Sequence, residues 1–391
     1  MIVNDYRDRY TSARKQDKSG ILDEIVVKTG WSRDHVRRLL AQSARGQESP
    51  QTRAGRPRRR EGKYSDEAKV ALEQVWDWSG RQSGKYLAAA MPVLLDALER
   101  HDSLPTGEGG YGRGVREELL SVSPASIDRY LRCARSCDFA SRNVSTRRSH
   151  VPSAEFLKFA GGDNEAEPGF FMVDTVAHTG ATARGDCVFT LNANCLHTGW
   201  VFTRSLSDNA PDRVADILQW SLDEITGIPF WVNAVELSNA CDGVHQAVAL
   251  WAQALDIHYS PVPKDHRRDR LPGASEHQHL VHEYGFVNHY DTEEERWVLN
   301  HLWRAVNDRL NFFTPIRKPV AWVRDATGHR KRIYDDPATP LRRLSEAGVM
   351  SPVQEAELIT YRNSLDPAKL AADISRWQKR LIEITTSTIP N

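Results

Sequence analysis

Short apolar runs in the middle of the chain predict β-strands. Runs rich in Val, Phe and Thr predict strands at 170–177, 187–193 and 200–205, with turns at Gly180 and Gly199. Because these three strands follow one another closely along the chain, they are expected to pair antiparallel.

From residue 211 onward the apolar runs alternate with helical patterns. Helices are expected at 211–225 and 244–255, and they separate strands expected at 230–237 and 257–261. Three strands followed by helix, strand, helix and strand predict an α/β domain with the RNase H-like order of elements. A long amphipathic helix at 293–313 is expected to cover the sheet.

Helical spacing also marks the first forty residues. Ile21, Leu22 and Ile25 recur with the period of a helix, Gly30 interrupts the pattern, and Ser32 can cap a second helix. Helix, glycine turn and helix form the helix-turn-helix signature. The basic residues that would face outward from the second helix, toward a DNA major groove, are Arg33, His35, Arg37 and Arg38. The alternative is a solvated face of a small helical bundle.

A basic stretch, residues 45–63, follows this pattern and reads as a linker. Its Gly55-Arg56-Pro57-Arg58 segment resembles an extended arm that lies in a narrow minor groove, and Arg59 extends the positive charge. A solvated basic linker explains the same residues equally well.

The remaining patterns complete a multidomain layout. Two helices are expected within 65–101 and another pair within 115–134, which together form a second helical DNA-binding module. A basic hairpin is expected at 320–334. A final helix at 368–384 carries Leu370, Ile374, Trp377 and Leu381 on one face, for packing inside the chain. The expected domains are 1–62 (helix-turn-helix and linker), 63–150 (second helical module), 165–315 (α/β core) and 316–391 (small β unit and helix).

Composition and charge refine this layout. A chain of 391 residues with 40% hydrophobic and 27% charged residues is an ordinary globular protein of several domains. The formal net charge is zero, but residues 1–70 hold 17 Lys and Arg against 10 Asp and Glu, which leaves −7 for residues 71–391. The positive charge is thus concentrated where a DNA-contacting element would use it.

Several classes of protein are disfavoured by the sequence. The five cysteines show no zinc-ligand spacing, so neither structural zinc nor a disulfide framework is expected, and Cys133 and Cys137 are expected to pack in the core. The chain has no apolar run long enough for a membrane span and no secretory signal at its start. These features predict a cytoplasmic protein.

Six segments in order carry a resemblance to a known family. They are ILDEIVVKTGWSRDHVRRLL at 21–40, SPASIDRYL at 123–131, PGFFMVDTVAHTG at 168–180, HTGW at 197–200, LNFFTP at 310–315 and KRIYDDPATPLRRL at 331–344. Together they resemble the integrase-core transposases of bacterial insertion elements, which are related in fold to retroviral integrases. The resemblance implies an RNase H-like catalytic core, double-stranded DNA as the partner, DNA integration or recombination as the activity, and homo-oligomers.

The resemblance also implies three acids that hold two Mg²⁺ or Mn²⁺ ions for displacement at phosphorus. Asp174 matches the first acid and would be the metal ligand. An ungapped match places Ser238 at the second acidic position and Ala274 at the third. A hydroxyl and a methyl group are poor replacements for carboxylates as ligands of hard cations. The sequence therefore favours a catalytically inactive member.

Nearby acids keep an active site open as an alternative. Glu236 lies two residues before Ser238, so it would face the same side of a strand, and Glu276 lies two residues after Ala274. Further spare acids are Asp242 and Asp269. Asp174 has its own structural interpretation, as a hydrogen-bonding residue at a strand end. Structural or solvent-facing roles are expected for His178, His266, His277 and His279.

Three functions compete on these observations. The first is a DNA-binding protein of the transposase family without catalysis, which needs no metal. The second is an active transposase that cleaves and joins DNA with Mg²⁺ or Mn²⁺ through Asp174 and substitute acids. The third is a protein-interaction module without nucleic acid, which the zero net charge favours. The first is preferred because the resemblance covers both the DNA-binding and the core regions.

Overall fold

The computed structural model describes residues 6, 9–10, 13–14, 17–29, 63–106, 110–141, 167–180, 186–225, 227–238, 242–261, 274–324 and 330–387. The chain divides into two compact units, residues 1–63 and residues 64–391. The expected second helix of the helix-turn-helix and the basic linker lie outside the described residues, together with Arg33, His35, Arg37, Arg38, Arg56, Arg58 and Arg59.

The first unit contains the helix α2 (Asp17–Thr29), which covers the first helix expected from the sequence. Leu22 and Ile25 of α2 pack with Tyr6 in a small apolar cluster. The Tyr6 hydroxyl donates a hydrogen bond to Glu24 Oε1 at 2.7 Å. The apolar positions of this helix therefore face inward, as their spacing predicts.

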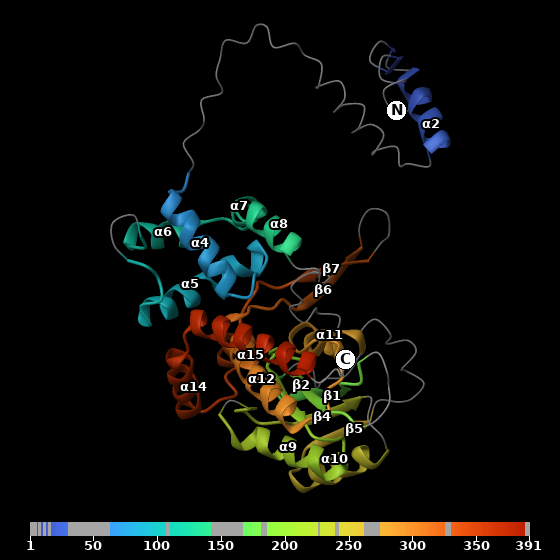
Figure 1. Ribbon diagram of the computed structural model, residues 1–391, viewed down its shortest axis with the longest axis vertical. Coiled ribbons are helices and arrows are strands. Elements are labelled where there is room, and N and C mark those ends of the chain that lie inside the picture. The colour runs from blue at the N-terminus through green and yellow to red at the C-terminus, as the bar shows by residue number, and fades with distance from the viewer. Residues whose placement is uncertain are drawn as a thin grey trace. The chain divides into compact units, whose positions relative to one another are not determined.

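A five-stranded mixed sheet organises the second unit (Figure 1). Its strands are β1 (Phe170–Ala177), β2 (Phe189–Cys195), β3 (Val201–Leu206), β4 (Ala234–Ser238) and β5 (His258–Pro261). They are arranged in the order β3-β2-β1-β4-β5. The first three pair antiparallel, whereas β4 is parallel to β1 and β5 is parallel to β4.

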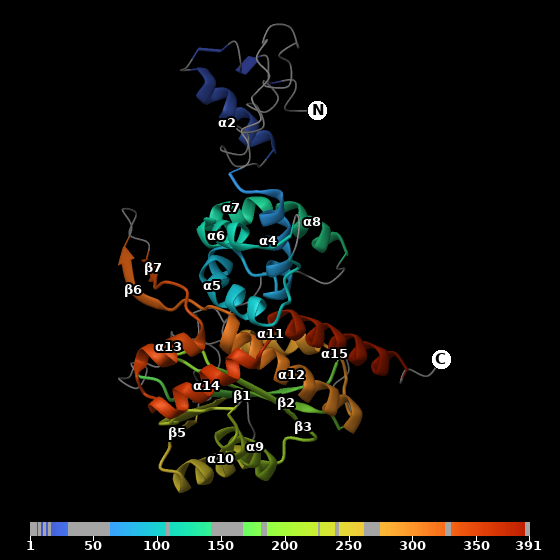
Figure 2. The same cartoon turned by 90° about the vertical axis from the view of Figure 1, so that its left-hand side faces the viewer.

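Helices cover both faces of the sheet (Figure 2). The helices α9 (Pro211–Asp223) and α10 (Asp242–Ala254) lie on one side, and α12 (Glu293–Phe313) lies on the other with α11 (Ala274–Gly285). Phe202 packs against Trp220 of α9, with ring centroids 5.9 Å apart. Because side chains alternate along a strand, Thr203 faces the side of α12.

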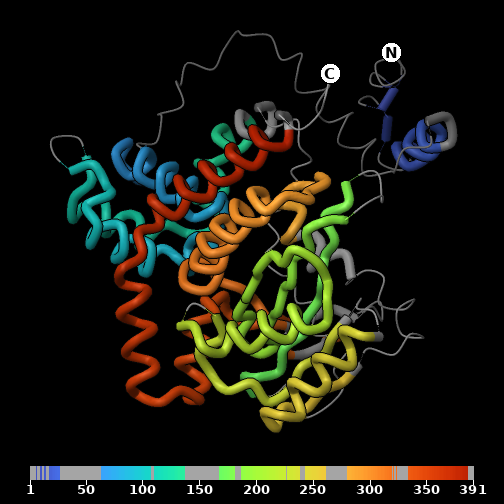
Figure 3. Tube along the Cα trace, turned by 60° about the horizontal axis from the view of Figure 1, so that its bottom comes forward, coloured from blue at the N-terminus to red at the C-terminus, as the bar shows by residue number. Residues whose placement is uncertain are grey.

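Helix α12 follows the bounds that its sequence predicts and begins with a capping box. The Thr292 side chain accepts from the Glu295 backbone N–H, and the Glu295 side chain accepts from the Thr292 backbone N–H. Its inward face is almost entirely buried, including Trp303 and Phe313. Figure 3 shows α12 between the sheet and α15 (Pro367–Ser387).

Three asparagines of α12 bind the backbone of the edge strand β3. Asn311 and Asn300 each bind both the N–H and the C=O of one strand residue, Val201 and Ser205 respectively. Asn307 donates to the Thr203 carbonyl at 3.1 Å. These contacts satisfy edge-strand groups that would otherwise be open to pairing with another chain.

The helices before the sheet share its core. They are α4 (Asp66–Trp78), α5 (Gly84–Arg100), α6 (Arg113–Ser121), α7 (Pro124–Tyr130) and α8 (Arg132–Ser141). Ser123 caps α7 by accepting from Ser126 N–H. One continuous apolar cluster runs from Tyr64 to Ile384. The segments expected as separate domains 63–150, 165–315 and 316–391 therefore join in one compact unit.

The end of the chain adds a hairpin and three helices. They are β6 (Pro319–Arg324), β7 (Arg330–Tyr334), α13 (Pro340–Ala347), α14 (Pro352–Ser364) and α15. The strands β6 and β7 form a separate antiparallel pair. Leu370, Ile374 and Leu381 of α15 are buried, and Trp377 packs on the core, which confirms the expectation of packing inside the chain.

Two expectations from the sequence are corrected by the structure. Residues 230–233 precede β4 instead of belonging to it, because Phe230 leaves the sheet to pack against Phe171 and Trp200 at 5.6 and 6.0 Å between ring centroids. The apolar character of Phe230 is therefore explained by core packing from a loop and not by a place in a strand. Cys133 is exposed on α8, since α8 continues beyond the apolar cluster that holds α7.

Candidate functional site

A row of polar positions crosses four neighbouring strands of the sheet. Thr203 on β3 is the register partner of Asn192 on β2, Asn192 is the partner of Asp174 on β1, and Asp174 is the partner of Ser238 on β4. Register partners in adjacent strands point to the same face of a sheet. This polar row therefore lies on the face that α12 covers.

Asp174 occupies the centre of the polar row and is 1% exposed. Its Oδ1 accepts a hydrogen bond from the Thr175 backbone N–H at 2.8 Å. Next to it, Thr203 Oγ1 donates to Asn192 Oδ1 at 2.8 Å. Burial of a carboxylate in a polar row requires hydrogen bonds or a cation, since an isolated buried charge is costly.

Glu236 places a second buried carboxylate on the same face. It lies two residues before Ser238 on β4, is 7% exposed, and is the register partner of Met172. Diagonal neighbours of this kind have Cα atoms roughly 7–8 Å apart. Asp174 and Glu236 are thus close enough for long side chains to approach one another, on strands that hold their backbones fixed.

The position expected for the third acid is on α11. Ala274 is the first residue of this helix, and Glu276 follows in its first turn. The helix packs on β1 and on α12, which brings its backbone to the side of the polar row. The side-chain positions of Ala274, Glu276, His277 and His279 lie outside the described part of the chain, as do His266 and Asp269.

His178, just beyond the end of β1, is a buried structural histidine. Its Nε2 lies 2.7 Å from Thr190 Oγ1, and its ring lies 5.1 Å from the ring of Tyr290. Burial lowers the pKa of His178 to about 3, with a further contribution from His282. The imidazole is therefore neutral at pH 7 and is positioned by hydrogen bonding and packing.

The described residues contain no group of three or more His, Cys, Asp and Glu side chains arranged to hold a metal ion. Within that part of the chain, the polar row offers Asp174 as a carboxylate and Asn192 as a neutral oxygen donor, and Glu236 beside the row adds a second carboxylate. A pair of divalent ions 3.5–4 Å apart is ordinarily held by several carboxylates. The described donor set does not fit such a pair.

The sequence did not single out Asn192 and Thr203, although a signal was available. Thr190, Asn192 and Asn194 alternate with apolar residues along β2, and this spacing places polar side chains on one face of a buried strand. All three are buried.

No helix in the described residues is long and apolar enough to cross a membrane.

Comparisons with known proteins give sparse results. No family model matches the chain. The chain is similar to the uncharacterized protein y4rM of Sinorhizobium fredii (strain NBRC 101917 / NGR234), with 28% identity over 349 residues that cover 88% of this chain and 93% of that protein. A protein of similar length therefore occurs in that bacterium.

Among solved structures, the chain is similar to a chain in the cryoEM structure of the simian T-cell lymphotropic virus intasome in complex with PP2A regulatory subunit B56 gamma. The TM-score is 0.28 and the identity is 9%, over 51% of this chain and 61% of that chain. A similarity at this level assigns neither an activity nor a partner.

Proposed function

We propose that this chain is a double-stranded-DNA-binding protein of the integrase and transposase lineage, whose RNase H-like core does not cut DNA. The observation that supports this most strongly is the pairing of Asp174 with Ser238 across β1 and β4. In a core of this lineage, acids at the first strand and at the end of the fourth strand hold the metal ions together. Here a serine stands opposite the aspartate.

The strand order supports the same proposal. An antiparallel meander of three strands, extended on one side by two parallel strands, is the arrangement expected for an RNase H-like domain. The long helix α12, which packs on β3 at one end of the polar row, follows the strands in the order that the sequence predicts. Fold alone does not define activity, and the serine at the expected second acidic position favours binding over catalysis.

The chemistry of the polar row explains why cleavage would fail. Metal-assisted displacement requires ions that stabilise both the attacking and the leaving oxygen. A serine hydroxyl is neutral at physiological pH and is a weak ligand for magnesium. Asp174 with a neutral partner would hold divalent ions too weakly and in too small a number for that reaction, while the DNA-binding surfaces would remain.

DNA contact is assigned to the basic N-terminal part of the chain. Residues 1–70 carry the excess of positive charge, and the proposed contacts are Arg33, His35, Arg37, Arg38, Arg56, Arg58 and Arg59. Each phosphate contact that releases a counterion adds roughly 0.9 to the slope of affinity against salt on logarithmic axes. Three arginine-to-alanine changes should therefore reduce this slope by about 2 to 3.

The test is a fluorescence anisotropy titration of the full chain with labelled duplex DNA in EDTA, across a series of salt concentrations. The triple variant Arg33→Ala, Arg37→Ala, Arg38→Ala should bind more weakly and with a smaller salt slope. A matched control removes three exposed cations elsewhere, Arg113, Arg342 and Lys379, and should bind like the wild type. Equal losses in the two triple variants would refute contact through the N-terminal residues.

A second candidate function, an active DNA transposase, is favoured by the buried carboxylate of Glu236 on the face of Asp174. In this alternative Asp174, Glu236 and a further acid such as Glu276 would bind Mg²⁺ or Mn²⁺ and activate the attacking oxygen. It requires Mn²⁺-dependent nicking of supercoiled plasmid that is lost in both Asp174→Asn and Glu236→Gln. Absence of nicking by the wild-type chain favours the first proposal.

A further inference from the structure

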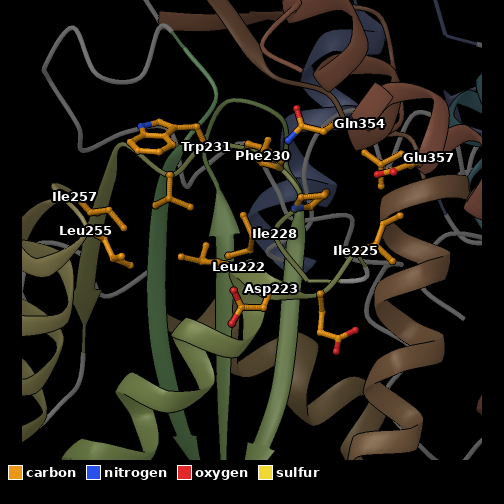
Figure 4. Close-up of a pocket in the computed structure, with 14 residues that line it drawn as sticks. Leu222, Asp223, Ile225, Ile228, Phe230, Trp231, Leu255, Ile257, Gln354 and Glu357 are labelled. Carbon is orange, nitrogen blue, oxygen red and sulfur yellow. The ribbon is translucent and has the colours of Figure 1, made fainter. Parts of the chain in front are cut away.

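A pocket of about 460 Å³ lies at the end of the sheet opposite to the polar row (Figure 4). It is lined by the loop between α9 and β4, by the residues just before β5, and by α14. Since this loop enters β4 at Ala234, the pocket lies at the amino end of that strand, whereas Ser238 lies at the carboxyl end. The two features are therefore separate.

The floor of the pocket is apolar and firmly packed. Ile228, Val232, Ile257 and Leu358 are each at most 7% exposed. Such a floor is formed before any ligand arrives, and its volume lies within the range of about 300–1,000 Å³ that is typical of ligand sites. It offers a binding place for one bulky apolar group without a rearrangement of the core.

The rim of the pocket combines exposed apolar side chains with acids. Trp231 is 70% exposed, and in Figure 4 it lies across the pocket from Ile225 and Glu357. The acids of the lining are Asp223, Glu224 and Glu357, and the lining contains no Lys, Arg or His. The potential at the rim is therefore negative, and it selects an occupant with positive charge.

The interactions of these three acids within the structure leave their negative charge available to a ligand. Among the described residues, none of the three carboxylates forms an ion pair. Glu224 interacts electrostatically with Arg204, but that guanidinium is stacked on Trp220, 4.0 Å from the ring centroid. The rim thus remains ready to receive a cation from outside.

The apolar surface continues beyond the pocket onto α14. Val353 is 66% exposed and lies one helical turn before Glu357, so both occupy one side of this helix. A small cation bound at the acidic rim would leave Val353 and most of Trp231 in water. A longer occupant covers all of them, and exposed apolar patches with polar rims mark protein interaction sites.

We propose that this pocket binds a short peptide segment of a partner protein, in which a bulky apolar residue stands next to lysine or arginine. The apolar residue enters the pocket and supplies most of the affinity, and Trp231 packs over it. The cation lies among Asp223, Glu224 and Glu357. This peptide-binding pocket does not depend on DNA binding or on the state of the polar row.

The proposal is tested with a phage library of random dodecapeptides selected on the full-length protein. Enriched peptides should contain Lys or Arg within two positions of a bulky apolar residue. Synthesised enriched peptides should bind Trp231→Ala about 30-fold more weakly, as for a loss of a central aromatic residue. The triple variant Asp223→Asn, Glu224→Gln, Glu357→Gln should bind about tenfold more weakly at low salt and lose most of its salt dependence.

The matched control is Trp297→Ala, which removes a tryptophan of comparable exposure on α12, outside the pocket. Its peptide affinity should equal that of the wild type, and the thermal midpoints of all variants should show that they are folded. Failure to enrich peptides, enrichment without basic residues, or equal binding by Trp231→Ala would overturn the proposal. A wild-type dimer that Trp231→Ala abolishes in sedimentation would assign the pocket to a second copy, and would overturn it too.

Discussion

Asp174 and Ser238 are direct register partners on the parallel strands β1 and β4. Their backbones are therefore held side by side, and the two positions belong to the same face of the sheet. The sequence match that places Ser238 at an acidic position of the transposase family coincides with this geometric neighbour of Asp174. The pair thus defines the place where a single substitution would add a carboxylate to the polar row.

Ser238→Asp is expected to create metal affinity. Two carboxylates on one sheet face attract divalent cations, and they repel each other when no cation is bound. The variant should bind Mn²⁺ about tenfold more tightly than the wild type in calorimetric titrations, a difference of about 1.4 kcal/mol. Its thermal midpoint should fall in EDTA and recover with Mn²⁺.

Ser238→Asn is the control for this substitution, because asparagine has the shape of aspartate without its charge. If Ser238→Asn bound Mn²⁺ as tightly as Ser238→Asp, the carboxylate at this position would not be the cause, and the interpretation of Ser238 as a lost ligand would be wrong.

Asn311→Ala is expected to destabilise the second unit strongly. Asn311 Oδ1 accepts from Val201 N–H and Asn311 Nδ2 donates to Val201 O, each at 2.8 Å, and both residues are 1% exposed. The variant leaves two buried backbone groups without partners, at about 1–3 kcal/mol each. Urea unfolding should show a loss of about 2–5 kcal/mol in the free energy of unfolding.

Asn300→Ala provides the comparison for Asn311→Ala. It removes the same pair of bonds from Ser205, but Asn300 is half-buried, so water can replace its amide. The loss should be no more than about 1 kcal/mol. Equal losses in the two variants would contradict the argument from burial.

Asp308→Asn is expected to raise stability at neutral pH. Burial raises the pKa of Asp308 to about 6 from 3.8, although the Tyr361 hydroxyl lies 3.1 and 3.0 Å from its two oxygens. Because the folded pKa is the higher one, wild-type stability falls as the pH rises from about 4 through 6. The free energy of unfolding of the variant minus that of the wild type should be about 2 kcal/mol larger near pH 7.5 than near pH 4.

The measurement for Asp308 is the free energy of unfolding of both proteins at several pH values. Tyr361→Phe is the informative second variant, because it removes a hydrogen bond that favours the charged carboxylate. As the pH rises, Tyr361→Phe should therefore lose stability more steeply than the wild type does. A difference between wild type and Asp308→Asn that is constant across this range would contradict the raised pKa.

His178→Gln is expected to reduce acid sensitivity. Burial lowers the pKa of His178 to about 3 from 6.5, so the unfolded chain binds a proton first as the pH falls. Stability from this histidine is therefore complete above about pH 6.5 and is lost as the pH falls toward 3. Between about pH 7 and pH 5 the wild type should lose about 2 kcal/mol more than the variant. Parallel pH curves for the two proteins would refute this.

The elements that the sequence predicts most accurately are those with strong local signals. The bounds of β1 and α12 coincide with the structure, because apolar runs of high β propensity and a Thr292–Glu295 capping box define them locally. Residues 230–233 differ, because Phe230 has the same apolar character in a loop that it would have in a strand. Only its distant partners Phe171 and Trp200 decide between the two.

The candidate site is predictable in part for the same reason. Asp174 and Ser238 are both identified through the resemblance to the transposase family, and the strand that holds Asp174 is marked by its own apolar run. The neighbours Asn192 and Thr203 enter the polar row through strand register, which is a long-range property. The asparagine contacts from α12 to β3 span about a hundred residues of sequence, so no local pattern specifies them.

The pocket beside Trp231 is a further feature that the sequence conceals. Its lining comes from the end of α9 and the loop before β4, from the residues just before β5, and from α14. Trp231 and Val232 form part of one apolar run, yet Trp231 is exposed and Val232 is buried. Such a contrast between neighbours depends on the fold around them, and it becomes visible only in the structure.

The most direct test of the central claim is the affinity of the full chain for duplex DNA, measured in EDTA and in Mg²⁺ at matched ionic strength. After each titration the DNA is recovered and analysed for cleavage. DNA binding without metal chemistry predicts an affinity in EDTA that is no lower than in Mg²⁺, a steep dependence on salt, and uncut DNA. No binding at low salt, or Mg²⁺-dependent cleavage that Asp174→Asn abolishes, would contradict it.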